Sequence, residues 1–170
     1  MKEEPLIRLR EVRKHYALNG GIFSQKRVVK AVDGVSFDIQ PGETFGLVGE
    51  SGCGKSTVGR SILRLFDITS GDIEFAGQDI AQASEKTLKP LRRRMQAIFQ
   101  DPWSSLNPGM TVQQLVAEPM KTHGYDAHTQ RERAEEMLYK VGLKSEHLTR
   151  FPHEFSGGQR QRISIARALS

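Results

Sequence analysis

Apolar and polar positions alternate in the first part of the chain, and glycine and proline mark the points where the pattern changes. Residues 6–16 are rich in apolar and basic side chains without helix caps, and they predict a first strand. Residues 35–40 alternate strictly, which is typical of a strand with one buried face. Two short apolar runs, 44–48 and 97–99, predict buried strands, and residues 71–77 predict a short strand that enters a turn.

A helical spacing of apolar residues replaces the alternation from about residue 55 onward. Ser84, Thr111, Thr129 and Ser156 are the expected starts of four later helices, and Pro90 interrupts or restarts the first of these. The expected helices cover residues 55–66, 111–123, 129–142 and 156–169, and a further basic helix starts at Ser84. Strands at the start followed by this helical portion predict an α/β core that carries a helical insertion.

Length, composition and charge exclude several classes of protein. A chain of 170 residues fits one domain, and the charged fraction of 26% argues against disorder. Cys53 is the single cysteine, so no internal disulfide can form, and no apolar run approaches the ~18–20 residues of a membrane span. The net charge is +5, and its basic clusters at 86–94 and 160–167 are interpreted as solvated helix faces. No nucleic-acid partner is therefore expected.

A glycine-rich loop lies between the run at 44–48 and the helix that follows it. It fits the pattern G-x-x-x-x-G-K-[ST] at every fixed position, with the expected strand before it and helix after it. Glycines let successive backbone N–H groups turn inward, and the helix start adds partial positive charge at the same point. The expected contacts to a nucleoside triphosphate are Gly49, Glu50, Ser51, Gly52, Cys53, Gly54, Lys55, Ser56 and Thr57.

Three side chains of this loop have distinct expected roles. The Lys55 ammonium can reach the β- and γ-phosphates, and the Ser56 hydroxyl can ligate Mg²⁺. Cys53 is interpreted as a small tolerated residue, with redox regulation as the alternative because a helix start lowers a thiol's pKa. A glycine turn with an incidental lysine is the alternative for the loop as a whole.

A second glycine pair opens the final helix about a hundred residues later. Ser156 is a natural N-cap, and two glycines behind it expose N–H groups at a helix start. An ordinary capped helix is the alternative interpretation. The phosphate loop upstream, and Gln100 after the run at 97–99, favour an anion site instead. Its expected residues are Ser156, Gly157, Gly158 and Gln159.

In these motifs the sequence resembles the ATP-binding subunits of ABC transporters. The phosphate loop, Gln100 in the glutamine-loop position and the signature at 156–159 occur in the family's order and spacing. Segments 49–57, 100–108 and 152–162 are closest to the dipeptide and oligopeptide importer branch, and the resemblance covers essentially the whole chain. Tyr16 falls where the family places an aromatic ring on adenine, with a half-buried strand tyrosine as the alternative.

The resemblance implies an ABC-type ATPase that uses ATP and Mg²⁺. Lys55 and Gln100 would be its catalytic residues, Ser56 and Gln100 would contact the metal, and the signature would close over ATP held by a second ABC ATPase subunit in a homo- or heterodimer. The implied partners are integral membrane permease subunits and, indirectly, a solute-binding protein. The implied location is the cytoplasmic face of the inner membrane, as a peripheral subunit. Trp103 is either an interface anchor or a core residue.

One departure from the family concerns the end of the sequence. The chain stops at Ser170, before the apolar strand with Asp-Glu (Walker B) and the switch histidine that such ATPases carry. We therefore expect a P-loop NTPase core of ABC type that is incomplete at the C-terminus, either as a fragment or as a short protein that hydrolyses ATP poorly. We expect 1–170 alone to be marginally stable and inactive. The expected domain is the N-terminal part of a nucleotide-binding domain, with a helical subdomain at about 103–155.

The function expected from the resemblance is energy coupling in a dipeptide or oligopeptide importer. One alternative is an importer ATPase for nickel or another small solute, because selectivity belongs to other subunits. A nucleic-acid ATPase of ABC type is a further alternative, although the interval between the two motifs has neither sustained heptads nor cysteine pairs. A P-loop kinase would not need the signature at 156–159.

Overall fold

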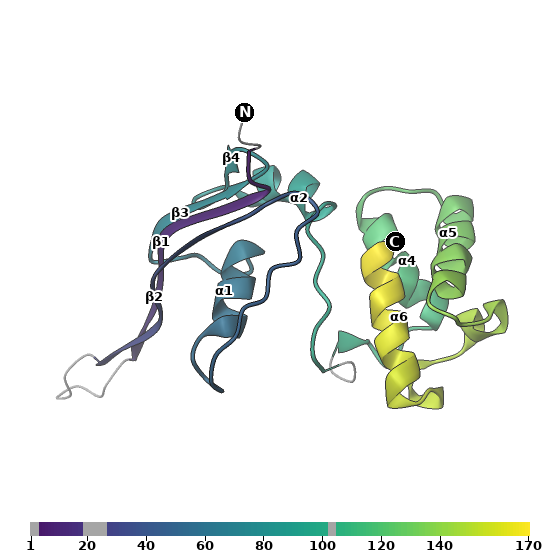
Figure 1. The fold of residues 1–170 in the computed structure, drawn as a ribbon. Coiled ribbons are helices and arrows are strands. Elements are labelled where there is room, and N and C mark those ends of the chain that lie inside the picture. Colours follow the sequence, from purple (N-terminus) through teal and green to yellow (C-terminus); the bar gives the residue numbers. More distant parts are fainter. Residues whose placement is uncertain (1–3, 19–26, 102–104) are drawn as a thin grey trace. The chain divides into compact units, whose positions relative to one another are not determined.

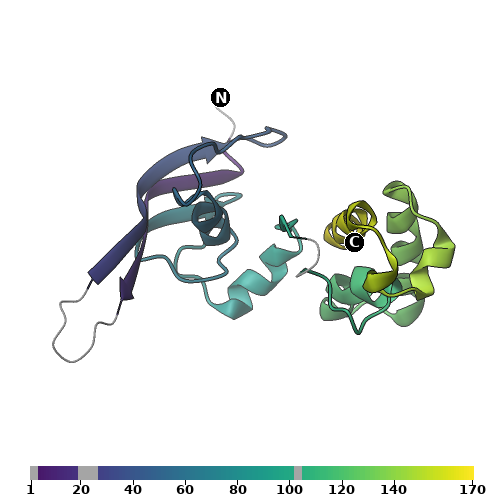
Figure 2. The ribbon, with the colours of Figure 1, turned by 90° about the horizontal axis from the view of Figure 1, so that it is seen from below.

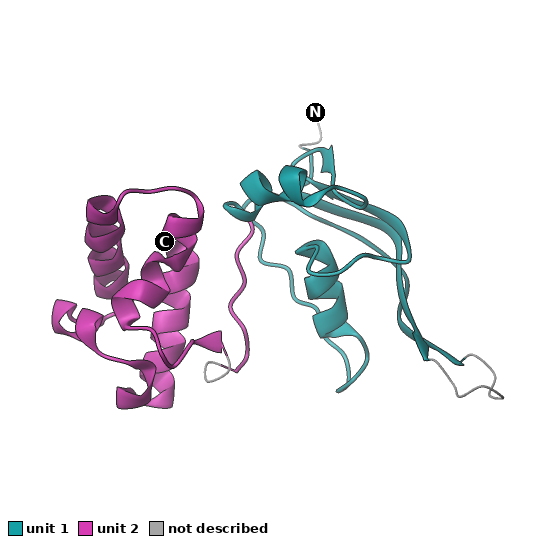
Figure 3. Cartoon of the chain, turned by 180° about the vertical axis from the view of Figure 1, so that it is seen from behind, with its two compact units in different colours: residues 1–94 teal, residues 95–170 magenta. Residues whose placement is uncertain are grey.

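The computed structural model describes residues 4–18, 27–101 and 105–170. The chain forms two compact units, residues 1–94 and 95–170 (Figure 3). Trp103 lies outside the described residues, as does the turn-rich stretch around Gly20.

The first unit is built on a four-stranded antiparallel sheet. Its strands are β1 (Ile7–Leu18), β2 (Arg27–Ile39), β3 (Ser70–Phe75) and β4 (Gln78–Asp79), in the order β2-β1-β3-β4 (Figure 1). The strands expected at 6–16, 35–40 and 71–77 are thus confirmed, and the first two are longer than expected.

The pairing of β1 changes along its length. The register shifts between Leu9 and Val12, where Glu11 has φ 47°. In a regular strand, residues three positions apart point to opposite faces, but this shift allows Leu9 and Val12 both to be fully buried. The β1–β3 pairing runs only from Ile7 to Arg13, whereas β1 pairs with β2 as far as Leu18. Residues 14–18 of β1 and their partners in residues 27–32 of β2 therefore form a two-stranded ribbon. We call it the β1–β2 ribbon.

Two helices complete the first unit, and α1 (Lys55–Ile62) lies on one face of the sheet (Figures 1 and 2). The expected extent of 55–66 was wrong at its end. Arg64 takes a left-handed conformation with φ 50°, and its buried side chain donates to the carbonyls of Ile80 and Phe66. These bonds hold a turn where the apolar spacing predicted more helix. The second helix, α2 (Glu85–Arg92), has the expected N-cap, Ser84.

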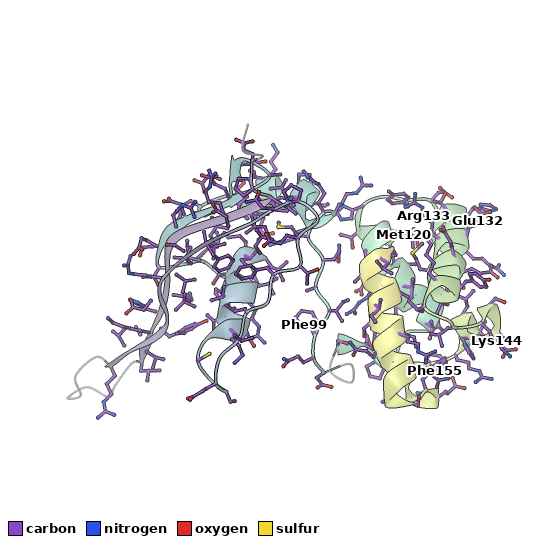
Figure 4. The ribbon with its side chains drawn as sticks, viewed as in Figure 1. Phe99, Met120, Glu132, Arg133, Lys144 and Phe155 are labelled. Carbon is purple, nitrogen blue, oxygen red and sulfur yellow. The ribbon has the colours of Figure 1, made fainter. Side chains whose placement is uncertain are left out.

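The strands expected at 44–48 and 97–99 are corrected by the structure. Neither segment is a strand, and no described strand pairs with either. Val48 is 89% exposed, and Phe99, labelled in Figure 4, is 42% exposed. An apolar run becomes a strand only where a neighbouring strand supplies hydrogen bonds, so composition alone could not decide the matter.

The second unit is helical. It contains α4 (Val112–Thr122), α5 (Ala127–Lys140), α6 (Gly157–Leu169) and two short 3₁₀ helices, η1 (Ser145–Thr149) and η2 (Pro152–Glu154). One apolar cluster joins the three α-helices to η1 and includes Phe155, which Figure 4 labels. Across the described ranges, no helix has the length and apolar character required to cross a bilayer.

The helix starts in this unit follow local capping chemistry. Thr111 and Ser156 are N-caps, as expected. The start expected at Thr129 was wrong, because Asp126 accepts from the amides of His128 and Thr129, 3.0 Å away in each case. The helix therefore begins at Ala127, and its cap is the carboxylate of Asp126, three residues before Thr129.

Candidate functional site

The phosphate loop, residues 49–57, follows β2 along the chain and runs into the first turn of α1. Gly54 is the residue before the helix, and it has φ 99°. A Cβ atom built at Gly54 would lie 2.2 Å from the backbone oxygen of Ala31 in β2. Only glycine permits both this conformation and this close approach. The first turn of α1 is consequently held directly against the sheet.

Positive charge converges at this helix start. The Lys55 ammonium donates to the carbonyl oxygens of Gly49, at 2.8 Å, and Glu50, at 2.5 Å, and lies 3.6 Å from Cys53 Sγ. Within the described residues, the amides of Gly54, Lys55 and Ser56 donate to no protein acceptor. A phosphate group supplies the acceptor oxygens that these amides lack, so the loop fits the tail of a nucleotide.

Tyr16 lies on the same unit as the loop. It pairs with Val29 of β2, two positions before the residue that contacts Gly54. The residue is 39% exposed, and its ring packs edge-on against Phe66, just beyond α1, with ring centroids 6.2 Å apart. These contacts bring Tyr16 to the α1 side of the sheet. A role in contacting adenine stays a prediction.

The signature residues form the first turn of α6 in the second unit. Ser156 Oγ accepts from the amide of Gln159, and Gln159 Oε1 accepts from the amide of Ser156, which closes a capping box. A Cβ atom built at Gly157 or Gly158 would meet nothing within 4 Å. The glycine backbone is therefore open to an approaching group.

Buried Arg160 fixes the loop in front of this helix. Its side chain donates to the carbonyls of Pro152, at 2.7 Å, and His153, at 3.3 Å. It is 4% exposed, so the guanidinium carries its charge inside the unit. Such charge-assisted bonds are about twice as strong as neutral ones, and they hold the signature loop in shape.

Gln100 lies at an exposed bend of the second unit, after the irregular segment 97–99. Further along, Ser105 Oγ is 3.1 Å from Ser164 Oγ of α6, and Arg167 donates to the Ser105 carbonyl at 2.6 Å. Ser105, five residues after Gln100, is thus attached to the signature helix. Among the described residues, no three His, Cys, Asp or Glu side chains gather as metal ligands.

The sequence pattern assigned no role to Lys14 or Arg64, and the expectation that the cluster at 160–167 is a solvated helix face was wrong for Arg160, which is 4% exposed. The proximity of Lys14 to Tyr16 could have been predicted, because residues two positions apart in a strand lie on the same face. No such signal exists for Arg64 or Arg160, because each acts on carbonyl oxygens at distances along the chain that no local pattern encodes.

A glycine-rich loop that runs into a helix start, with an ammonium group among the loop carbonyls, defines a P-loop nucleotide-binding protein. Comparison with known families narrows this class. The family model described as ABC transporter matches residues 32–170. The chain belongs to this family.

Curated relatives place the chain close to peptide transport proteins. It is 52% identical to the oligopeptide transport ATP-binding protein AppF of Bacillus subtilis (strain 168), over 99% of this chain and 52% of that protein. It is 50% identical to the glutathione import ATP-binding protein GsiA of Salmonella typhimurium, over 98% of this chain and 27% of that protein. The chain spans about half the length, or less, of these relatives.

Solved structures confirm the predicted fold. The dimeric structure of MJ0796, a bacterial ABC transporter cassette, matches with a TM-score of 0.82 and 30% identity, over 96% of this chain and 68% of that chain. A dimeric post-hydrolysis state of the same cassette, bound to ADP and Pi, matches with a TM-score of 0.81 and 29% identity, over the same shares of the two chains. The chain therefore has the fold of an ABC-type P-loop ATPase with an antiparallel N-terminal sheet.

Proposed function

We propose that this chain belongs to the ATP-binding and ATP-hydrolysing energy-coupling subunit of an importer for dipeptides or oligopeptides. The observation that carries the proposal is the geometry at residues 49–57, where free helix amides and the Lys55 ammonium converge. That arrangement suits a polyphosphate better than a single small anion, because several donors lie along one loop.

Each residue of the loop has a task in this proposal. Lys55 exchanges the carbonyls of Gly49 and Glu50 for phosphate oxygens and orients them. The Ser56 hydroxyl and the Gln100 amide oxygen are oxygen donors of the kind that Mg²⁺ prefers, and the ion would keep further ligands from the phosphates. When bound, Mg²⁺ neutralises charge on the phosphate oxygens. Gln100 would also orient the attacking water.

We further propose that the signature acts on a second subunit. Ser156, Gly157, Gly158 and Gln159 would close over ATP held by the partner's phosphate loop. Open space beside the two glycines supports this role, and the similar cassette MJ0796 was solved as a dimer. ATP would favour the closed dimer because only the closed form offers it both sets of contacts.

Peptides are the cargo that the relatives favour. Both AppF and GsiA are named for import or transport of short peptides, since glutathione is itself a tripeptide. Neither the nickel alternative nor the nucleic-acid alternative has such support. We propose that the chain works with permease subunits at the cytoplasmic face of the membrane, with residues of about 103–155 as its helical subdomain.

Calorimetric titration with Mg-ATP tests the central proposal. The parent should bind Mg-ATP, and Lys55→Ala should weaken binding by more than about tenfold, because a charge-assisted hydrogen bond is lost. Lys86→Ala, at an exposed lysine of α2, is the matched control and should bind like the parent. A parent that binds no Mg-ATP, or a Lys55→Ala variant that binds as well as the control, contradicts the proposal.

A further inference from the structure

A lysine of β1 lies between two aromatic rings in the first unit. Lys14 Nζ is 4.9 Å from the centroid of the Tyr16 ring and 4.9 Å from the centroid of the Phe66 ring. The two rings meet edge-on at an interplanar angle of 72°. The ammonium thus lies in the angle between them, within cation–π distance of both.

The position of this ammonium is fixed by the turn after α1. Lys14 Nζ donates to the backbone oxygen of Asp67 at 2.6 Å. Arg64, whose side chain is 4% exposed, donates to the Phe66 carbonyl at 2.8 Å and to the Asp67 carboxylate at 3.0 Å. A buried guanidinium therefore orders the residues that hold Lys14. The turn follows directly on the helix whose first residues form the phosphate loop.

Tyr16 needs such support because of its place in the sheet. The pairing of β1 with β3 ends at Arg13, so Tyr16 lies in the β1–β2 ribbon with one neighbouring strand. The contacts of the Tyr16 ring are made by Lys14 and Phe66. Tyr16 as a whole residue is 39% exposed, so these contacts do not enclose it.

We propose that Lys14 is a positioning residue for nucleobase binding: it holds the Tyr16 ring in a stacking orientation at the nucleotide site. This inference rests on the proposed function. A cation on one face of a ring also withdraws π-electron density, which reduces the repulsion between that ring and a base stacked on its other face. Lys14 acts through Tyr16 and not by attracting phosphate.

Two ligands separate these modes of action. Mg-ATP carries a base, whereas Mg-tripolyphosphate carries the same kind of anionic tail without one. Lys14→Met, which keeps an apolar stem of similar length, should weaken Mg-ATP binding about two- to fivefold and leave tripolyphosphate binding unchanged. Lys14→Arg should restore ATP binding, because a guanidinium also stacks on rings. Lys86→Met on α2 is the matched control and should change neither affinity.

A double-mutant cycle tests whether Lys14 acts through the ring. Tyr16→Ala should weaken Mg-ATP binding, and adding Lys14→Met to it should cause no further loss. The inference is overturned if the two losses multiply, if Lys14→Met weakens tripolyphosphate binding equally, or if it leaves ATP binding unchanged. Retained tripolyphosphate binding shows that each variant has a folded loop. A parent that binds neither ligand overturns the proposed function, and this inference with it.

Discussion

Replacing Gly54 by alanine tests whether the phosphate loop depends on close contact with the sheet. At φ 99°, an L residue is strained, and the new Cβ would lie 2.2 Å from the Ala31 oxygen. The conformation costs roughly 1–2 kcal/mol, and overpacking adds about 1–3 kcal/mol. The sum of about 2–5 kcal/mol is a large part of the ~5–15 kcal/mol that stabilises a typical domain.

Two other glycines serve as matched controls for this substitution. Gly52 has φ 80° but open space around its Cβ position, so Gly52→Ala should cost roughly 1–2 kcal/mol from conformation alone. Gly59 lies inside α1 with open space and ordinary helical φ, so Gly59→Ala should stabilise the protein by about 0.5–1 kcal/mol.

Urea unfolding and Mg-ATP titration together measure the effect. Gly54→Ala should lower the midpoint by roughly 1–2 M relative to the parent, and it should weaken ATP binding because the α1 amides move with the loop. Gly59→Ala should bind ATP like the parent. Equal midpoints for Gly54→Ala and Gly52→Ala would refute the argument from the Ala31 contact, as would parental ATP affinity in a Gly54→Ala variant.

Two further predictions concern the helical unit. Leu115 is fully buried in the apolar cluster, so Leu115→Ala should destabilise the protein by about 2–5 kcal/mol in urea unfolding. Tyr139→Ala is the control, because Tyr139 is 82% exposed. Equal losses of stability in the two variants would contradict the assigned core. The hydroxyl and amide of Thr129 hold the pKa of Asp126 below its ordinary value of 3.8. The ionised cap therefore stabilises α5 above about pH 4 and loses this effect as pH falls through the lowered pKa. In urea unfolding between about pH 6 and pH 3, Asp126→Asn should show a weaker pH dependence than the parent, and equal slopes would contradict this.

Local chemistry made several features of this fold predictable from sequence. Ser84, Thr111 and Ser156 cap helices through bonds to amides three residues away, so the cap and its partner appear in one short segment. The phosphate loop is equally local, because its glycines and its lysine all lie within residues 49–56.

Features that depend on distant partners were not predictable. The end of α1 is set by Arg64, which reaches Ile80, sixteen residues away. The ring pair of Tyr16 and Phe66 joins positions fifty residues apart. Segments 44–48 and 97–99 have the composition of buried strands, but strand formation depends on neighbours that sequence pattern alone does not specify.

The β1–β2 ribbon has a consequence for how the molecule fluctuates. A ribbon of two strands opens at a lower free energy than the three-stranded part of the sheet, so its amides should exchange with solvent earliest among the strands of the first unit. A molecule that binds Tyr16 only in the closed ribbon would raise the free energy of opening by its binding free energy. Ligand binding would then slow deuterium uptake at the amides of the β1–β2 ribbon, although the ribbon lies outside the phosphate loop.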